Sequence, residues 1–239
     1  MKTKTLTSFA AVILSMTLLF AAKQTQAQSR EDNLQYEEVK SKKNFSNSTF
    51  GIKIGLGRPT GDFADDDMEN PQAGLAEDGL LFELEYNYFL NEQIFFGFLG
   101  RFQLNKADPQ PIAQFNSQFY PSTFLIEVTT EPWRANSFMA GIGTSSAMGS
   151  KAKLLSRFML GFTSFSSPSI QLRVSDPFQT SVTITQNSRN DMALSFLAGL
   201  GVSFPVKEGL DFVAKADYFG SRPEFDGITA TASGAATGT

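Results

Sequence analysis

The sequence has no cysteine and no histidine among its 239 residues. The absence of cysteine excludes disulfide bonds, thiol catalysis, thiolate metal sites and lipid attachment through a thiol. The absence of histidine removes the commonest general base and metal ligand, so a Ser-His-Asp triad and an imidazole zinc site are excluded. The sequence also contains no G-x-S-x-G nucleophile motif. We therefore expect a protein that is not an enzyme and that has no cofactor and no catalytic metal.

Neither sign of charge is in large excess, since the formal net charge is only −4. The chain therefore lacks the basic surface that nucleic acid binding requires, and we expect no nucleic acid partner. Beyond the first 27 residues no apolar run approaches the roughly 20 residues of a membrane helix. Most of the aromatic residues are phenylalanine, with 24 Phe against 1 Trp. So many Phe side chains need either a large core or a surface that faces lipid.

The first 27 residues have the three-part order of a secretory signal peptide. Two lysines precede an apolar stretch from Phe9 to Ala22, and a short polar end follows with small residues up to Ala27. We predict cleavage after Ala27. The alternative is a retained anchor, but the stretch is shorter than a membrane span and is interrupted by Ser15 and Thr17. Residues 28–48 are polar and charged and are predicted to form a flexible periplasmic tail before the folded domain, residues 49–239.

From Phe50 onward the apolar residues recur with period two, which indicates strands with two unlike faces. The clearest run is Gly79 to Leu90, where five large apolar residues alternate with Glu83, Glu85 and Asn87. Seven runs follow this pattern: 50–58, 79–90, 94–105, 137–145, 154–165, 191–204 and 210–219. The connectors between them alternate between long and short, which is typical of transmembrane barrels with short periplasmic turns and long outer loops. The sequence thus predicts an all-β fold, an antiparallel up-and-down transmembrane β-barrel.

The charged residues of these runs share a strand face with many of the glycines. The charges are Lys53, Glu83, Glu85, Arg101, Arg157, Asp211, Lys215 and Asp217, and the glycines are at positions 51, 55, 97, 161, 199 and 201. A narrow lumen needs small residues, and enclosed charges must be balanced, so we predict that this face lines the lumen. The Phe-rich face then meets lipid, with Tyr86, Tyr88 and Tyr218 at the interfaces. The alternatives are a soluble lipocalin-like barrel and a periplasmic sandwich.

Seven antiparallel strands do not close such a barrel, because the first and the last run in the same direction. An eighth strand is expected after Ser221, but the tail from Gly227 to Thr239 is rich in Ala, Gly and Thr. This tail fits the last outer loop better than a membrane strand. We therefore expect an eight-strand plan whose last strand is missing or atypical, through truncation at the C-terminus or an unusual closure.

The opening Phe50-Gly51-Ile52-Lys53-Ile54-Gly55, followed by Pro59-Thr60-Gly61-Asp62-Phe63, resembles the first strand and loop of small outer-membrane barrel proteins. These are the eight-stranded porin-like or OmpA/OmpX-type domains common in the Bacteroidetes. The resemblance spans residues 50–221 and implies a cell outer membrane location, with lipid and the outer-membrane assembly machinery as partners. Members usually end on a strand with a terminal aromatic residue, and this sequence departs from that pattern by ending Thr237-Gly238-Thr239. No peptidoglycan-binding domain follows the barrel region in this sequence.

Three groups of residues are candidates for a function. The lumen charges form either a salt-bridged plug or a polar path for ions or small solutes, and an eight-stranded lumen is about filled by its own side chains, which favours the plug. The acidic cluster Asp62, Asp65, Asp66, Asp67 and Glu69 fits a solvated loop better than a Ca²⁺ site, since its spacing differs from an EF-hand. The aromatic segment 107–133 indicates either a surface for an extracellular ligand or strands that extend beyond the membrane.

We therefore predict a monomeric barrel with a structural or interaction role and long extracellular loops. The alternatives are a narrow porin-like channel and, with less support, a soluble exported binding barrel. A lipid-acting enzyme is disfavoured, because without histidine it would depend on Ser or carboxylate chemistry alone.

Overall fold

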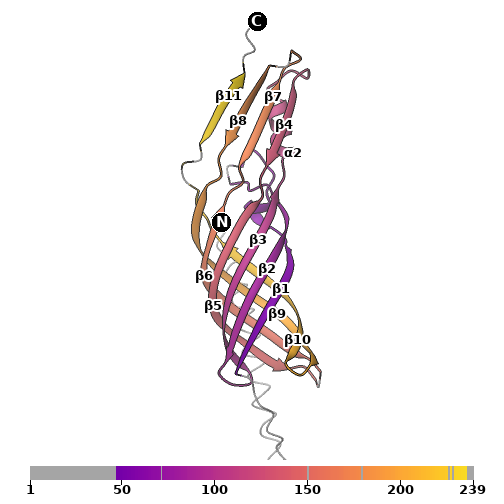
Figure 1. Cartoon of the computed structure of the whole chain (residues 1–239), viewed down its shortest axis with the longest axis vertical. Helices are drawn as coiled ribbons and strands as arrows, with labels where there is room; N and C mark the ends of the chain where they lie inside the picture. The colour runs from indigo at the N-terminus through magenta and orange to yellow at the C-terminus, as the bar shows by residue number, and fades with distance from the viewer. Residues whose placement is uncertain are drawn as a thin grey trace, which may run out of the picture. The chain divides into compact units, whose positions relative to one another are not determined.

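Two antiparallel sheets make up the part of the chain that the structure describes (Figure 1). The computed structural model describes residues 47–70, 72–149, 151–178, 180–225, 227 and 229–235, which belong to one compact unit, Phe45–Thr239. The predicted signal peptide and nearly all of the predicted tail lie outside these residues. No helix within the described ranges is long and apolar enough to cross a membrane.

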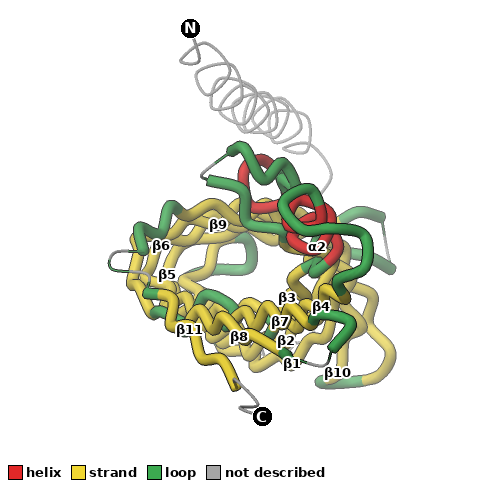
Figure 2. Tube along the Cα trace, turned by 90° about the horizontal axis from the view of Figure 1, so that it is seen from above, coloured by secondary structure: helices red, strands yellow, loops and turns green. Residues whose placement is uncertain are grey.

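The first sheet has seven strands in the order β1-β2-β3-β5-β6-β9-β10. Their bounds are β1 (Ser48–Gly57), β2 (Ala76–Phe89), β3 (Ile94–Ala107), β5 (Trp133–Ala147), β6 (Lys153–Ser166), β9 (Asn190–Lys207) and β10 (Leu210–Ser221). Every neighbouring pair is antiparallel. All seven predicted strands are confirmed, and their observed ends differ from the predicted ones by a few residues, mostly outward. The sheet curls around a common centre into a half-barrel (Figure 2).

The buried face of this sheet carries the charges, and the exposed face carries the large apolar side chains. On β2, Glu83 and Glu85 are 1% and 2% exposed, whereas Phe82 and Tyr86 are 38% and 42% exposed. A soluble sheet shows the opposite arrangement, with apolar residues buried and charges in water. The inversion predicted from the shared positions of glycine and charge is therefore present in the fold.

The concave face is not purely polar, because four apolar side chains form a fully buried cluster at its centre. These are Leu99, Met139, Met159 and Leu197, with Phe219 packed against them. Glycines make room for large side chains on this face. A Cβ on Gly97 would collide with the end of the Met159 side chain, and a Cβ on Gly143 would collide with the Phe95 ring. Large residues thus interlock with glycines across the concave face, as a narrow interior requires.

The second sheet has four strands in the order β11-β8-β7-β4. Their bounds are β4 (Leu125–Thr130), β7 (Ile170–Ser175), β8 (Ser181–Gln186) and β11 (Ala230–Ala235). β4 precedes β5, β7 follows β6, β8 precedes β9, and β11 follows β10. The order β4-β7-β8-β11 of the second sheet therefore corresponds to the order β5-β6-β9-β10 of the first sheet. Backbone hydrogen bonds between the connecting segments, such as Glu131 N to Ser169 O at 3.0 Å, join the two ladders.

The long connectors were predicted to be loops, and this is wrong for much of their length. Residues 107–136 contain helix α2 (Gln110–Ser117) and strand β4, while residues 166–190 contain β7 and β8. Among its described residues, the first connector contains the short 3-10 helix η1 (Gly61–Ala64) and the first residues of β2. The tail was predicted to be the last outer loop, but Ala230–Ala235 pairs with β8 as β11. Among the described residues, the tail thus supplies no eighth strand to the first sheet.

Candidate functional site: an ion-pair network on the concave face

The register of the first three strands places a row of alternating charges on the concave face. Lys53 of β1 stands opposite Glu83 of β2, which stands opposite Arg101 of β3. Arg101 donates two hydrogen bonds to Glu83 Oε1, from Nε at 2.8 Å and from Nη2 at 2.5 Å. Lys53 Nζ lies 3.5 Å from Glu83 Oε2 and also pairs with Glu85. Opposite charges on neighbouring strands attract directly across the row.

Arg157 reaches the same carboxylates from β6, on the other side of the half-barrel. Its Nη1 donates to Glu85 Oε2 at 2.8 Å, and its Nη2 donates to Glu83 Oε2 at 3.2 Å. The same guanidinium donates two hydrogen bonds to Asp217 of β10, at 3.1 Å and 2.6 Å. The Arg157 side chain is only 2% exposed. A fully buried guanidinium needs partners for its fork of donors, and these three carboxylates provide them.

Lys215 of β10 completes the network. Its Nζ donates to both oxygens of Glu85 at 2.8 Å. Arg101 Nη2 lies 3.5 Å from Asp217 Oδ2, and the Arg101 guanidinium stacks 5.3 Å above the centre of the Phe219 ring. The network thus joins β1, β2, β3, β6 and β10 through four cations and three carboxylates. By formal count it holds one basic side chain more than carboxylates.

The structure brings seven of the eight predicted lumen charges into this network and leaves one outside. Asp211 is exposed beside the turn between β9 and β10, where the register shifts, and accepts a hydrogen bond from Ser203 Oγ at 2.8 Å. Asp211 lies outside the network because it is at the end of its strand. Alternation in the sequence predicts which face a residue occupies, but not how far along the barrel axis it lies.

A chain of hydroxyl groups beside the network was not predicted. Ser195 donates to Thr163 at 2.7 Å, and Thr163 donates to Ser137 at 2.8 Å. Ser195 and Ser221 are also 2.9 Å apart. These residues lie on β5, β6, β9 and β10, and strand alternation places Thr163 and Ser195 on the same face as the charges. Cross-strand register, which a single strand pattern does not contain, brings the four hydroxyls together.

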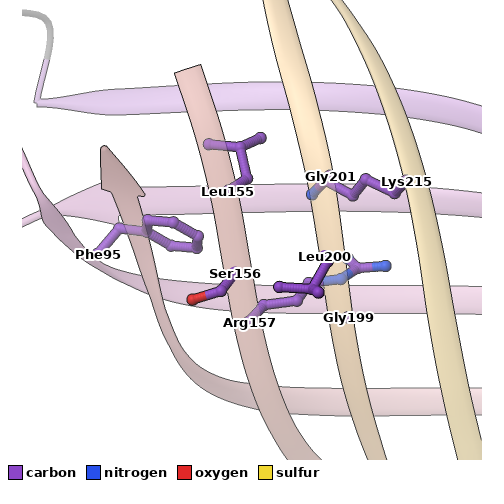
Figure 3. Close-up of a pocket in the computed structure, with 8 residues that line it drawn as sticks. All are labelled: Phe95, Leu155, Ser156, Arg157, Gly199, Leu200, Gly201 and Lys215. Carbon is purple, nitrogen blue, oxygen red and sulfur yellow. The ribbon is translucent and has the colours of Figure 1, made fainter. Parts of the chain in front are cut away.

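Little free space remains around the network. A narrow pocket lies beside Arg157 and Lys215, with Phe95 on its other side, and it has no room for a water-sized sphere. In Figure 3, the Arg157 and Lys215 side chains extend from β6 and β10, and Gly199 and Gly201 of β9 lie between them. Because the charges are paired with one another and this pocket admits no water, the geometry favours the plug over the polar path.

At the end of the sheet where η1 lies, three aromatic rings pack together. The Trp133 ring lies 5.2 Å from Phe63 and 5.6 Å from Phe225, and its Nε1 donates to Gly74 O at 2.8 Å. The rings belong to the first connector, the start of β5 and the segment after β10. They tie these three segments together.

The acidic cluster forms a hydrogen-bonded loop beside these rings. Asn70 Nδ2 donates to Asp65 Oδ2 at 2.7 Å, and Asp67 N donates to Asp65 Oδ1 at 3.1 Å. These bonds, the Asn70 one above all, lower the pKa of Asp65 from its ordinary value of 3.8. Nearby, an exposed pair with Asp78 raises the pKa of Arg58, chiefly through the hydrogen bonds between them. Within the described ranges, no three acidic side chains are grouped so that they could hold a metal ion.

The aromatic segment 107–133 is split between burial and exposure. Ile112 of α2 is buried, while Phe119 is 67% exposed. Phe115 and Phe119 pack edge to face at 5.3 Å, and Tyr120 packs against Phe124 at 6.0 Å. The segment therefore builds α2 and β4 and leaves one large ring on the surface.

No protein-family model matches this chain, and neither a curated protein nor a solved structure matches it significantly.

Proposed function

We propose that this chain is a non-enzymatic integral protein of the bacterial outer membrane, a β-barrel of eight-strand plan. The inverted faces of the first sheet carry this proposal. Its buried face holds an ion network, while its outer face is a continuous apolar surface. Apolar area in contact with water is unfavourable in proportion to its extent, so this outer face favours lipid as its surroundings.

The outer apolar surface extends over all seven strands. Its large exposed side chains on the central strands include Phe96, Phe98, Phe102, Phe138, Phe158, Leu160, Phe162, Leu194 and Leu200. Monomeric soluble proteins rarely expose apolar patches of more than a few hundred square ångströms. A soluble lipocalin-like barrel would bury this face and hydrate the charges, so it is disfavoured.

The ends of the sheet differ in a way that supports an orientation. Three tight connections, at residues 90–93, 148–152 and 208–209, lie at one end of the strands, and the second sheet continues from the other. Barrels of the outer membrane have short periplasmic turns and longer outer segments. The second sheet, with α2 and the acidic loop, therefore stands outside the cell, where its role is interaction or structure.

The alternative function is a channel, and the side chains in the lumen disfavour it. The paired charges and the buried methionines occupy the concave face, and the pocket beside Arg157 is too narrow for water. In planar lipid bilayers we expect current at the background level, and steady single-channel steps would support the channel.

Fractionation of the full chain, expressed with its leader in a bacterium with two membranes, tests the proposal. We expect the protein in the outer-membrane fraction and a band whose gel migration changes on heating, because a folded barrel resists detergent at room temperature. Recovery as a soluble periplasmic protein whose migration does not change on heating would overturn the proposal.

A further inference from the structure

The outward face of β3 changes from apolar to charged near the outer end of the strand. From Ile94 to Leu104 every second residue faces outward, and none of these outward residues is polar. This stretch has the length of a strand that crosses a bilayer, roughly 9–11 residues. Lys106 is the next outward residue, and it is exposed. With β3 across the membrane, Lys106 lies at the level of the lipid headgroups.

The neighbouring strand β5 shows the same change. Phe138 faces outward and is 69% exposed. The next two outward residues towards the outer end, Asn136 and Arg134, are polar and exposed. Arg134 is the register partner of Leu104, so Lys106 is its diagonal neighbour across the two strands. Side chains at such positions start about 7–8 Å apart, so one small anion can contact both. We call Lys106 and Arg134 the cation pair.

The cation pair has no acidic partner in the described part of the chain. Neither Lys106 nor Arg134 forms an ion pair there. Two acidic residues lie near Lys106 at the start of β2, where the register shifts. Of these, Asp78 is held by Arg58 through two hydrogen bonds of 3.2 Å, and Glu77 makes no ion pair. Two positive charges therefore stand unpaired on the outward face.

The cation pair lies on interior strands of the first sheet. β3 lies between β2 and β5, and β5 lies between β3 and β6. A further strand that closes the sheet would pair with β1 or with β10, which are the outer strands in this order. The surroundings of the cation pair within the sheet are therefore independent of how the sheet closes.

The second sheet, beyond the outer end of these strands, has the opposite face polarity. On β7, Leu172 and Val174 are 8% and 6% exposed, whereas Gln171 and Arg173 are exposed. Buried apolar residues and exposed polar ones are the arrangement of a sheet in water. The exposed surface thus changes from apolar to polar between the two sheets, and the cation pair lies where it changes.

We propose that the cation pair binds the anionic phosphate headgroup of a lipid in the outer leaflet. The guanidinium of Arg134 presents a fork of N–H donors that matches two phosphate oxygens, and the Lys106 ammonium donates to the same group. The acyl chains of this lipid lie against the apolar outward residues of β3 and β5. A free phosphate ion lacks this apolar contact, so the ligand is a lipid. The inference rests on the proposed function, because it requires β3 and β5 to cross the membrane.

Fluorescence quenching by brominated lipids tests the inference on the full chain, refolded into phosphatidylcholine vesicles. The chain has no native cysteine, so bimane attached to Asn136→Cys reports contact with the acyl chains just below the cation pair. The same label on Thr144→Cys, an exposed position at the other end of β5, provides the control site. Brominated phosphatidate, whose headgroup is a phosphate monoester, is compared with brominated phosphatidylcholine at both sites.

At Asn136→Cys we expect phosphatidate to compete about tenfold more strongly than phosphatidylcholine, because charge-assisted hydrogen bonds hold its headgroup. At Thr144→Cys the two lipids should quench equally. Lys106→Gln together with Arg134→Gln should abolish the preference at Asn136→Cys. Lys151→Gln, at an exposed turn of the opposite end, should leave the preference unchanged. Gel migration that changes on heating shows that each variant is folded.

Equal quenching by the two lipids at Asn136→Cys would overturn the inference. A preference that survives in the double variant, or that is equally large at Thr144→Cys, would also overturn it, since the attraction would then not belong to the cation pair. Inorganic phosphate added at constant ionic strength should change nothing, and a loss of the preference would show a site for a soluble anion instead. All these results leave quenching by phosphatidylcholine intact. The absence of quenching by either lipid at both sites would instead contradict the proposed function.

Discussion

Arg157 and Asp217 form a bidentate pair that passes directly over Gly199. The register sets Arg157 of β6 opposite Gly199 of β9, and sets Gly199 opposite Asp217 of β10. The two side chains meet above the glycine through hydrogen bonds of 3.1 and 2.6 Å. A Cβ on Gly199 would collide with Asp217 Oδ1 and lie 3.3 Å from Arg157 Nε. The absence of a side chain on β9 thus allows an ion pair between strands that are not neighbours.

Gly199→Ala should therefore destabilise the folded protein. The added methyl group displaces the Asp217 carboxylate, and overpacking of this kind costs about 1–3 kcal/mol. Gly51→Ala is the matched control, because Gly51 also lies on the inward face but a Cβ there meets nothing within 4 Å. Urea unfolding of both variants in lipid vesicles measures the difference, and equal midpoints would contradict the arrangement over Gly199.

Arg157→Gln should cost more, because it leaves two buried carboxylates, Glu83 and Glu85, and the partly buried Asp217 with fewer positive partners. Removal of one partner from a buried charge network costs about 3–5 kcal/mol. The control is Arg58→Gln, which removes an ion pair with Asp78 whose side chains are 81% and 56% exposed. Solvent screens such a pair, so the control should unfold at the wild-type urea concentration. Similar midpoints for the two variants would show that the network is hydrated rather than buried.

Asn70→Ala should raise the pKa of Asp65 back towards 3.8, because it removes the hydrogen bond that contributes most to the lowered value. A carboxyl whose pKa is lowered by folding stabilises the loop above its unfolded pKa, and this stabilisation disappears as the pH falls through the folded pKa. The variant should therefore lose pH dependence in the window at and below 3.8. Carboxyl ¹³C titration by NMR checks the change. Gln72→Ala, on an exposed neighbour, should leave the titration of Asp65 as it is.

The seven strands of the first sheet were predictable because their signal is local. A residue such as Phe158 and its neighbour Arg157 must point to opposite faces of a strand, so alternation in the sequence maps directly onto the two faces. The same signal was present in β7, where Ile170, Leu172 and Val174 alternate with Gln171 and Arg173. This run lies inside the long connector 166–190, and the alternation of long and short connectors predicts an outer loop there.

The network was predictable only in part. Charges and glycines lie on the same strand faces, which indicated that Glu85 and Arg157 both point inward. The two residues are 72 positions apart, however, and they meet only because the sheet curls. The same applies to the apolar cluster, since Leu99 and Leu197 interrupt polar faces in sequence and find one another across the concave side. Curvature depends on the packing of all seven strands, and no single strand pattern contains it.

The central claim is that the outer face of the first sheet contacts lipid, and a cysteine scan along β6 tests it most directly. The chain has no native cysteine, so single variants from Phe158→Cys to Thr163→Cys each provide one labelling site. Spin labels in lipid vesicles then report contact with oxygen dissolved in the acyl chains. We predict high oxygen contact at positions 158, 160 and 162 and low contact at 159, 161 and 163. High accessibility of positions 158, 160 and 162 to a water-soluble relaxation agent, with no oxygen periodicity, would contradict a membrane-embedded barrel.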